Sequence, residues 1–302
     1  MVAGCALALN AQATEGGATN KIPGVDTVLV GVMGPPGSLR NTNFFGYYQA
    51  SSTLDGSGNP RQGLSNFDLT AWAFTVRLQY VWPEAKFLGA DVESRLGLSA
   101  YGDVRVHFDV QTPRGAVQRS GSSSEVAPGA IVAPTLFGWH GETVHQVAGP
   151  EIFLSTHAYD PAALANASTG FNSIAPAYWI TWLPDPRVEL DGSFVYLFNQ
   201  KNSKTHYTSG NELNVDYGAG YAVSPVWQAG VSGYLYKQTT DDELNGTGVP
   251  GGNRGRALAI GPYVRYHPSR DFGVTLKWQS ESGVENRAKG NRFFLQVAIG
   301  GL

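Results

Sequence analysis

Residues 71–82 read Ala-Trp-Ala-Phe-Thr-Val-Arg-Leu-Gln-Tyr-Val-Trp. The second residue of every pair is large and apolar, whereas the first is small or polar in all pairs but the last. Successive side chains of a β-strand point to opposite faces, so this stretch predicts a strand with one apolar and one mixed face. Its apolar face begins at Trp72 and ends at Trp82, which is typical of the aromatic girdles of a membrane-spanning strand.

The same alternation recurs through most of the chain and predicts twelve strands. The third strand is long enough to contain a kink at 101–103. The limits of the twelve predicted strands are about 42–52, 68–82, 87–110, 126–140, 145–157, 173–183, 187–199, 211–223, 226–238, 254–267, 271–281 and 290–302.

The connections between these strands alternate in length. Short turns are predicted at 83–86, 141–143, 184–186, 224–225 and 268–271. Longer polar loops are predicted at 53–67, 111–125, 158–172, 200–210, 239–253 and 282–289. A membrane barrel has short periplasmic turns and longer extracellular loops, so this alternation favours a barrel with both of its ends on the periplasmic side.

The composition excludes several other classes of protein. Of 302 residues only 15% are charged, 42% are hydrophobic, and 38 glycines are spread along the chain, which argues against helices and against disorder. A net charge of −3 gives no field that would gather nucleic acid. The sequence therefore predicts an all-β, closed antiparallel transmembrane barrel in a Gram-negative outer membrane. A soluble β-sandwich is the alternative, but it would not separate its loops by length.

The beginning of the chain has a different pattern. Residues 5–13 read Cys-Ala-Leu-Ala-Leu-Asn-Ala-Gln-Ala, an apolar run followed by the small-residue spacing of a signal-peptide cleavage site. Residues 1–13 are thus predicted to be a signal-peptide remnant, with a disordered N-terminus and a lipoprotein box at Cys5 as alternatives. Residues 14–41 form an N-terminal segment, either periplasmic or lumenal, and residues 42–302 the barrel.

The mixed faces of the predicted strands carry charges of both signs. An arginine or lysine facing lipid at mid-bilayer costs about 2–4 kcal/mol, so these side chains are assigned to the lumen. There they pair across the barrel, or they shape a pore and its field. The predicted channel-lining residues are Arg77, Gln79, Glu93, Arg95, Glu189, Asp191, Glu212, Asp216, Tyr234, Tyr236, Arg256, Arg265, Lys277 and Arg292, and Arg105 and Asp109 share these faces.

Tyr234 and Tyr236 are assigned to the lumen for a separate reason. They share a strand face with Gln228 and Ser232, and an aromatic lumen wall would suit aromatic solutes. If the phase of this strand is reversed, both tyrosines instead contact lipid.

Sequence motifs for catalysis or metal binding are missing. The chain has no phosphate-binding loop, no Cys-x-x-Cys pair and no His-Glu-x-x-His motif, so no cofactor or metal is predicted. An outer-membrane lipase, which needs a Ser–His pair, is the sharpest enzymatic alternative. His145 and Ser155 share a predicted strand, but ten residues at ~3.3 Å separate them by about 33 Å. A structural or adhesive barrel is a further alternative.

Several stretches resemble a known family. They are 127–140, Tyr159-Asp160 with Asn166, 199–202, 207–212, 233–242, 252–256, 261–266 and 285–290. Together they are similar to the outer-membrane channel family associated with the degradation of aromatic compounds, the phenol meta-pathway family. Residues 155–158, Ser-Thr-His-Ala, depart from the family's usual Pro-Thr-Gly segment. The resemblance implies a monomeric barrel, surrounded by outer-membrane lipid, that admits hydrophobic or aromatic small molecules by passive diffusion.

Overall fold

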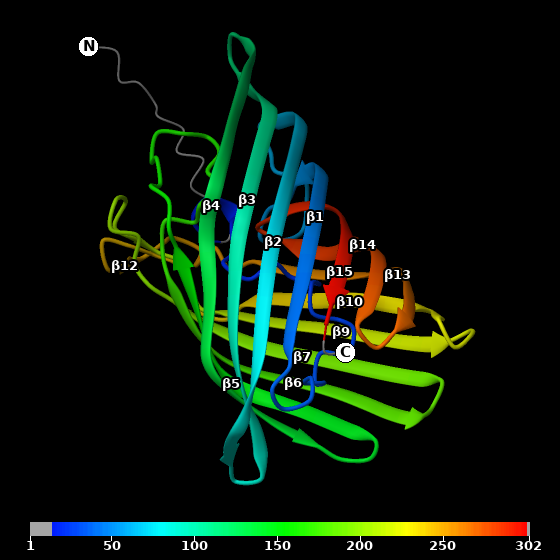
Figure 1. Ribbon diagram of the computed structural model, residues 1–302. Coiled ribbons are helices and arrows are strands. Elements are labelled where there is room, and N and C mark those ends of the chain that lie inside the picture. The colour runs from blue at the N-terminus through cyan, green and yellow to red at the C-terminus, as the bar shows by residue number, and fades with distance from the viewer. Residues whose placement is uncertain (1–13, 301–302) are drawn as a thin grey trace.

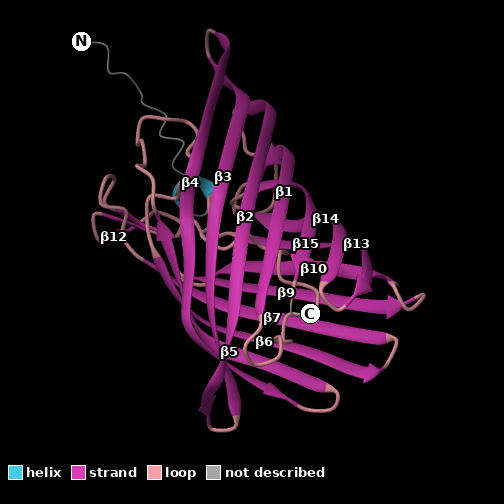
Figure 2. Ribbon diagram, in the orientation of Figure 1, coloured by secondary structure: helices cyan, strands magenta, loops and turns pink. Residues whose placement is uncertain are grey.

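The computed structural model describes residues 14–300, in which twelve antiparallel strands close into a barrel (Figures 1 and 2). The strand β1 pairs with β15 and closes the sheet. In chain order the barrel strands are β1 (Leu39–Thr53), β2 (Leu64–Phe87), β3 (Ala90–Thr112), β4 (Gly115–His140), β5 (Val144–Ser155), β6 (Ser173–Asp185), β7 (Val188–Asn199), β9 (Glu212–Ala222), β10 (Trp227–Gln238), β13 (Arg256–Ser269), β14 (Phe272–Glu285) and β15 (Ala288–Ile299). The predicted fold class is confirmed.

The remaining elements are short. A 3-10 helix, η1 (Glu15–Gly17), precedes the barrel, and a small sheet of β8 (Tyr207–Thr208), β11 (Glu243–Leu244) and β12 (Thr247–Gly248) joins two loops. Within residues 14–300, no helix is long and apolar enough to cross a membrane. The predicted signal-peptide remnant at residues 1–13 lies outside the described part of the chain.

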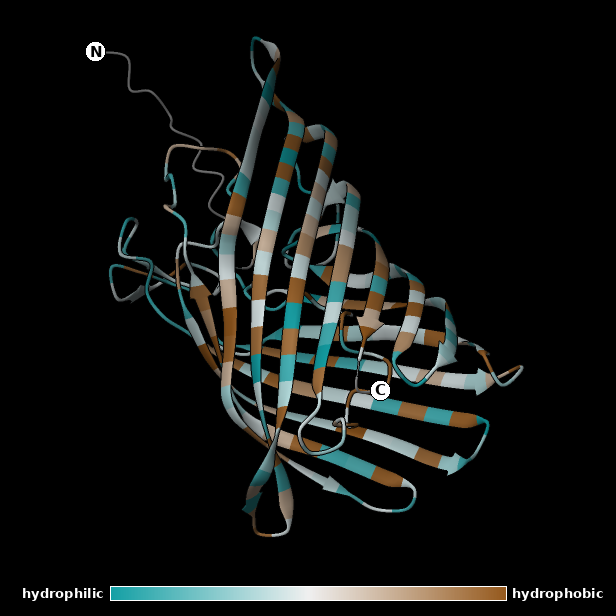
Figure 3. Cartoon of the chain, viewed as in Figure 1, coloured by the Kyte–Doolittle hydropathy of each residue, from teal (hydrophilic) through white to brown (hydrophobic). Residues whose placement is uncertain are grey.

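The two faces of the strands differ as the sequence predicts. In β2 the large side chains of Trp72, Leu78 and Trp82 are exposed on the outer face, whereas Ala73 and Arg77 line the interior. Figure 3 shows the same alternation of hydrophobic and hydrophilic residues along the other strands. A closed sheet pairs its backbone polar groups internally, and an apolar outer face is compatible with lipid. This architecture places the chain in the Gram-negative outer membrane, and the predicted location is confirmed.

The connections at the two ends of the barrel differ in length. At the periplasmic end, turns of two to four residues join neighbouring strands, whereas loops at 54–63, 156–172, 200–211 and 239–255 extend from the other end. Three predicted connections were wrong. Residues 83–86 belong to β2, and most of 111–125 and 282–289 belong to strands.

The long β3–β4 hairpin explains the largest of these differences. Its strands remain paired from Arg105 and Ser122 to Thr112 and Gly115, and Figure 1 shows the hairpin extending beyond its neighbours. Residues 115–124 of β4 are exposed at most positions of both faces, so small and polar residues replace the alternation on this side of the hairpin. Composition alone therefore made this region resemble a loop.

A β-bulge in β3 reverses the strand's faces. The pairing of β3 with β4 shifts register between Ser99 and Tyr101, close to the predicted kink at 101–103. Beyond the shift, Val106 and Phe108 line the interior, while the Arg105 side chain is 70% exposed. One extra residue exchanges the two faces of a strand. The lumenal placement predicted for Arg105 and Asp109 is therefore wrong.

Candidate functional site

The N-terminal segment, residues 14–38, lies inside the barrel. Near the extracellular end, the Glu15 amide donates to the Ser209 hydroxyl (3.0 Å). Farther along, the Leu29 amide donates to the Glu189 carboxylate (3.1 Å), and the Gly37 amide to the Val81 carbonyl (2.8 Å), just before β1 begins. The segment therefore crosses the lumen from the extracellular to the periplasmic side. Of the two alternatives given for this segment, periplasmic and lumenal, this is the lumenal one. Its expected end, 39–41, is already part of β1.

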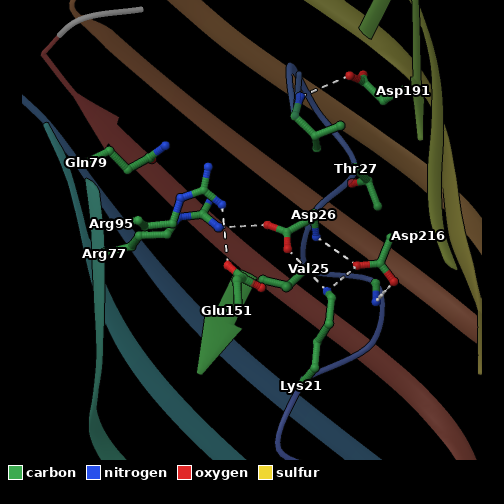
Figure 4. A network of polar contacts seen from close by, with 12 residues as sticks. Lys21, Val25, Asp26, Thr27, Arg77, Gln79, Arg95, Glu151, Asp191 and Asp216 are labelled. Carbon is green, nitrogen blue, oxygen red and sulfur yellow. Dashed lines mark hydrogen bonds and ion pairs between the residues drawn. The ribbon is translucent and has the colours of Figure 1, made fainter. Parts of the chain in front are cut away.

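A buried charge network holds the middle of this segment (Figure 4). The Asp216 carboxylate of β9 accepts hydrogen bonds from the amides of Gly24 (2.8 Å) and Asp26 (3.1 Å), and it pairs with Lys21 Nζ (3.0 Å). On the opposite side, Arg77 of β2 pairs with Asp26 (2.8 Å). The segment thus links two walls of the barrel through ion pairs, which are stronger away from bulk water.

Other predicted lumenal side chains bind the backbone of the segment. Lys277 Nζ donates to the Val25 carbonyl (2.7 Å), and Asp191 accepts from the Val30 amide (3.1 Å). Glu212 accepts from the hydroxyl of Thr19. The contacts of Lys277 and Asp191 satisfy backbone groups that would otherwise be buried without partners, and that of Glu212 holds a side chain of the segment. The lumenal charges of this region therefore bind the chain itself.

Gly24 is required at a close approach of the segment to the wall. Its φ angle is +82°, and a Cβ atom there would lie 2.7 Å from Cδ1 of Tyr234. Any other residue would combine backbone strain with a steric clash.

The remaining predicted residues with inward side chains pair with one another. Glu93 accepts from Gln79 (3.2 Å) and pairs with Arg95 (3.1 Å), which also lies 3.6 Å from Glu151. Two further pairs are Arg265 with Glu189 (3.3 Å) and Arg292 with Glu281 (3.8 Å). Most of these pairs lie along the barrel wall and do not cross the lumen, because Glu93 and Arg95 share β3, and Arg292 and Glu281 lie on the neighbouring strands β15 and β14.

Arg256 is not in the lumen. It lies at the extracellular end of β13, on the same face as the exposed Leu258, and pairs with Glu285 (3.0 Å). Arg256 and Leu258 are two residues apart and therefore share a face, so the alternation of β13 itself excludes a lumenal Arg256.

Tyr234 and Tyr236 point inward but are not exposed to an open channel. Both are almost completely buried, in a cluster with Leu54, Ala257 and Val284. The expected aromatic wall is absent because the N-terminal segment and the neighbouring strands cover these rings, and neither tyrosine lines the cavity described next.

A cavity of about 1270 Å³ occupies the extracellular half of the barrel. Its upper wall is apolar and includes Phe67, Leu69, Val106 and Phe108, with the Ala-rich loop 161–165 above. The floor is polar and consists of the N-terminal segment together with side chains of three strands. Those side chains are Arg77, Arg95 and Glu151.

Sequence reasoning missed the apolar wall. Phe67 and Leu69 lie on the same face of β2 as Ala71. Leu69 was already inside the predicted strand 68–82, and extending that strand by one residue would have added Phe67. Val106 and Phe108 face inward because of the β3 bulge. The kink predicted at 101–103 indicated its position but not the exchange of the two faces.

The extracellular loops around the cavity are tied together. The Asp242 carboxylate accepts from the Gly210 amide (2.7 Å), Gln238 (2.6 Å) and Asn253 (3.0 Å), and also from the Tyr207 hydroxyl. Burial raises the pKa of Asp242, and these donors oppose the increase. Burial also raises the pKa of Glu15 at the start of the segment.

Ser155 and His145, the pair considered for a lipase, lie at opposite ends of β5. Ser155 Oγ lies 2.6 Å from Ser168 Oγ, and His145 Nδ1 lies 3.2 Å from His140 Nδ1 at the other end of β5. In the same residues, no group of three or more His, Cys, Asp or Glu side chains is arranged to hold a metal ion.

The fold is similar to that of a solved outer-membrane channel. The crystal structure of an outer-membrane channel from Pseudomonas putida F1 matches with a TM-score of 0.71 and 14% sequence identity, over 93% of this chain and 99% of that chain. The beta domain of the Bordetella autotransporter BrkA matches less well, with a TM-score of 0.46 and 11% identity, over 87% of this chain and 99% of that chain. At these identities the similarity concerns the fold alone.

Sequence comparison defines the family. No curated protein shows significant sequence similarity to this chain. The family model described as "putative MetA-pathway of phenol degradation" matches residues 50–297, which is most of the barrel. The chain therefore belongs to the family whose description is "putative MetA-pathway of phenol degradation".

Proposed function

We propose that this protein is a monomeric outer-membrane channel for the passive uptake of bulky hydrophobic or aromatic small molecules. One observation carries the proposal: the cavity of about 1270 Å³ in the extracellular half of a closed barrel, with an apolar upper wall. Binding sites for weakly polar ligands are concave, mostly apolar and of this order of size. The family membership and the channel fold of the Pseudomonas putida protein support the same proposal.

The N-terminal segment sets the constriction on this route. Below the large cavity lies a second, small cavity with a volume of about 40 Å³, near Arg40 and Arg265 at the periplasmic side. The layer formed by Asp26, Arg77 and Arg95 separates the two. A cavity of about 40 Å³ holds only one or two water molecules, so a bulky solute passes only when the segment shifts.

Uptake by whole cells tests the proposal. A strain that lacks this protein is compared with the complemented strain at low external concentrations of a bulky, weakly polar aromatic solute, under conditions where inner-membrane and catabolic steps are not limiting. The deletion should slow uptake of this solute and leave a small polar nutrient unaffected. Flux through the protein should be linear in the gradient and independent of energy, because diffusion drives it.

Two results would contradict the proposal. One is undiminished uptake of the aromatic solute in the deletion strain. The other is hydrolysis of phospholipid by the purified barrel, which would favour the enzymatic alternative.

A further inference from the structure

Three polar side chains form a group at one wall of the large cavity. Thr53 is the last residue of β1, Arg61 lies in the loop after it, and Arg287 lies in the turn between β14 and β15. All three line the cavity. Backbone hydrogen bonds join their positions, because the Leu54 amide donates to the Arg287 carbonyl (2.9 Å) and the Arg61 amide to the Thr53 carbonyl (3.0 Å).

These side chains have unused hydrogen-bonding capacity. Thr53 Oγ1, Arg61 Nε and Arg287 Nη1 are buried and have no hydrogen-bond partner within residues 14–300. Only 4% of Thr53 and 8% of Arg287 is exposed. A buried donor without an acceptor is costly, and most buried polar groups in proteins are paired. The group is therefore suited to a bound acceptor.

The positive charge of the group is not neutralised by a direct ion pair. Neither Arg61 nor Arg287 forms a salt bridge to an acidic residue of the described chain, and the Arg287 guanidinium stacks 4.1 Å from the centre of the Tyr236 ring. The acidic residues that interact electrostatically with Arg287 include Glu212 and Glu281. Both of these carboxylates have other partners.

Glu281 accepts hydrogen bonds from Tyr48 (2.9 Å), the Gly290 amide (2.7 Å) and Tyr234, and Glu212 accepts from Asn199 (2.8 Å) and Thr19. These hydrogen bonds hold both carboxylates to other parts of the lumen.

An apolar surface adjoins the polar group. Ala288, which follows Arg287 and pairs with Thr53, packs against the buried cluster that contains Phe67, Val106 and Phe108. The cavity therefore offers two guanidinium groups and a hydroxyl beside an apolar wall.

We propose that Thr53, Arg61 and Arg287 bind the oxyanion of a solute that carries one carboxylate, or a similar monoanionic head, on an apolar body. The head contacts the two guanidinium groups, whose planar arrays of N–H donors match a carboxylate. The apolar body lies against Phe67 and Phe108. This inference rests on the proposed function and specifies the solute class as hydrophobic or aromatic acids.

Calorimetry with three matched probes tests the inference on the purified, full-length barrel at pH 7. The probes are 4-phenylbutyrate, 4-phenylbutan-1-ol and 4-phenylbutylamine, which share one apolar body and differ in head group. The carboxylate should bind about tenfold more tightly than the alcohol, and the amine most weakly. Added salt should weaken binding of the carboxylate and not that of the alcohol.

Variants locate the site. Replacing both arginines, Arg61→Gln with Arg287→Gln, should remove the preference for the carboxylate and leave binding of the alcohol unchanged, whereas the paired Lys variants should retain part of it. Arg114→Gln is the matched control, because this exposed arginine lies in the β3–β4 turn away from the cavity. Heat-modifiable migration in gels verifies that each variant is folded. If the Gln variants do not fold, the salt dependence of carboxylate binding and the carboxylate preference of the Lys variants test the anion site instead.

The outcomes separate this inference from the proposed function. Equal binding of alcohol and carboxylate, or a carboxylate preference that survives the double Gln substitution, overturns the anion site but leaves the channel proposal intact. Binding of none of the three probes, together with undiminished uptake in the deletion strain, overturns both.

Discussion

One carboxylate, Asp216, has a large share in holding the N-terminal segment in the lumen. It binds two backbone amides of the segment and the buried ammonium group of Lys21. Sequence alternation correctly indicated that Asp216 faces inward, but it could not reveal these partners. Lys21 and Asp26 lie in a segment without strand periodicity, so no pattern marks them as lumenal.

Asp216→Asn should loosen the segment. The amide keeps an acceptor oxygen but loses the charge that pairs with Lys21, and removing one partner of a buried ion pair is costly. The expected result is an increase of roughly twofold or more in single-channel conductance in planar bilayers, with the same amount of folded barrel. Asp68→Asn, at an exposed position of β2, is the control and should not alter conductance. Unchanged conductance of Asp216→Asn would show that the segment does not depend on this carboxylate.

The two faces of β2 should also differ in their tolerance of charge. Leu78 is exposed on the outer face between the two tryptophans, whereas Ala73 lines the large cavity. Leu78→Arg should cost about 2–4 kcal/mol and reduce the amount of assembled barrel, and Ala73→Arg should be tolerated because its charge reaches water. The heat-modifiable fraction in isolated outer membranes measures both. Equal amounts of the two variants would contradict the assignment of the faces.

Among the elements, strands with one face toward lipid were predicted well, and those outside the bilayer were not. The strand at 68–82 was predicted from its alternation and is the central part of β2. In the upper β3–β4 hairpin, residues 115–124 of β4 are exposed on both faces, so their Ser- and Gly-rich sequence had no reason to alternate. The bulge near Ala100 then inverted the faces of β3 beyond it.

A proline scan should distinguish these two kinds of strand. Val76→Pro lies in the membrane-spanning part of β2, where a broken ladder leaves backbone groups in lipid, so assembly should fail. Val117→Pro lies in the upper hairpin, where water can satisfy the same groups, and assembly should be nearly unaffected. Quantifying the folded barrel in outer membranes compares the two. Loss of assembly with Val117→Pro would mean that the upper hairpin is needed for barrel closure.

At the scale of the whole molecule, the sequence predicted a closed barrel but not what fills it. Twelve strands, their antiparallel order and the difference between the two ends follow from local periodicity and loop length. The division of the lumen into a large extracellular cavity and a small periplasmic one depends on the segment 14–38. That division arises from contacts between residues some 50 to 250 positions apart, such as Asp26 with Arg77 and Val25 with Lys277, which no local pattern encodes.

The central claim is that weakly polar solutes cross the outer membrane through this lumen, and narrowing the lumen tests it most directly. Ala71→Trp with Ala73→Trp places two indole rings in the large cavity, whereas Ala229→Trp with Val231→Trp places two on the exposed outer face of β10. Uptake of a bulky aromatic solute is measured in cells that carry equal amounts of each folded barrel. The lumenal pair should lower uptake toward the level of the deletion strain, and the outer pair should leave it at the wild-type level. Wild-type uptake with the lumenal pair would contradict a route through the barrel.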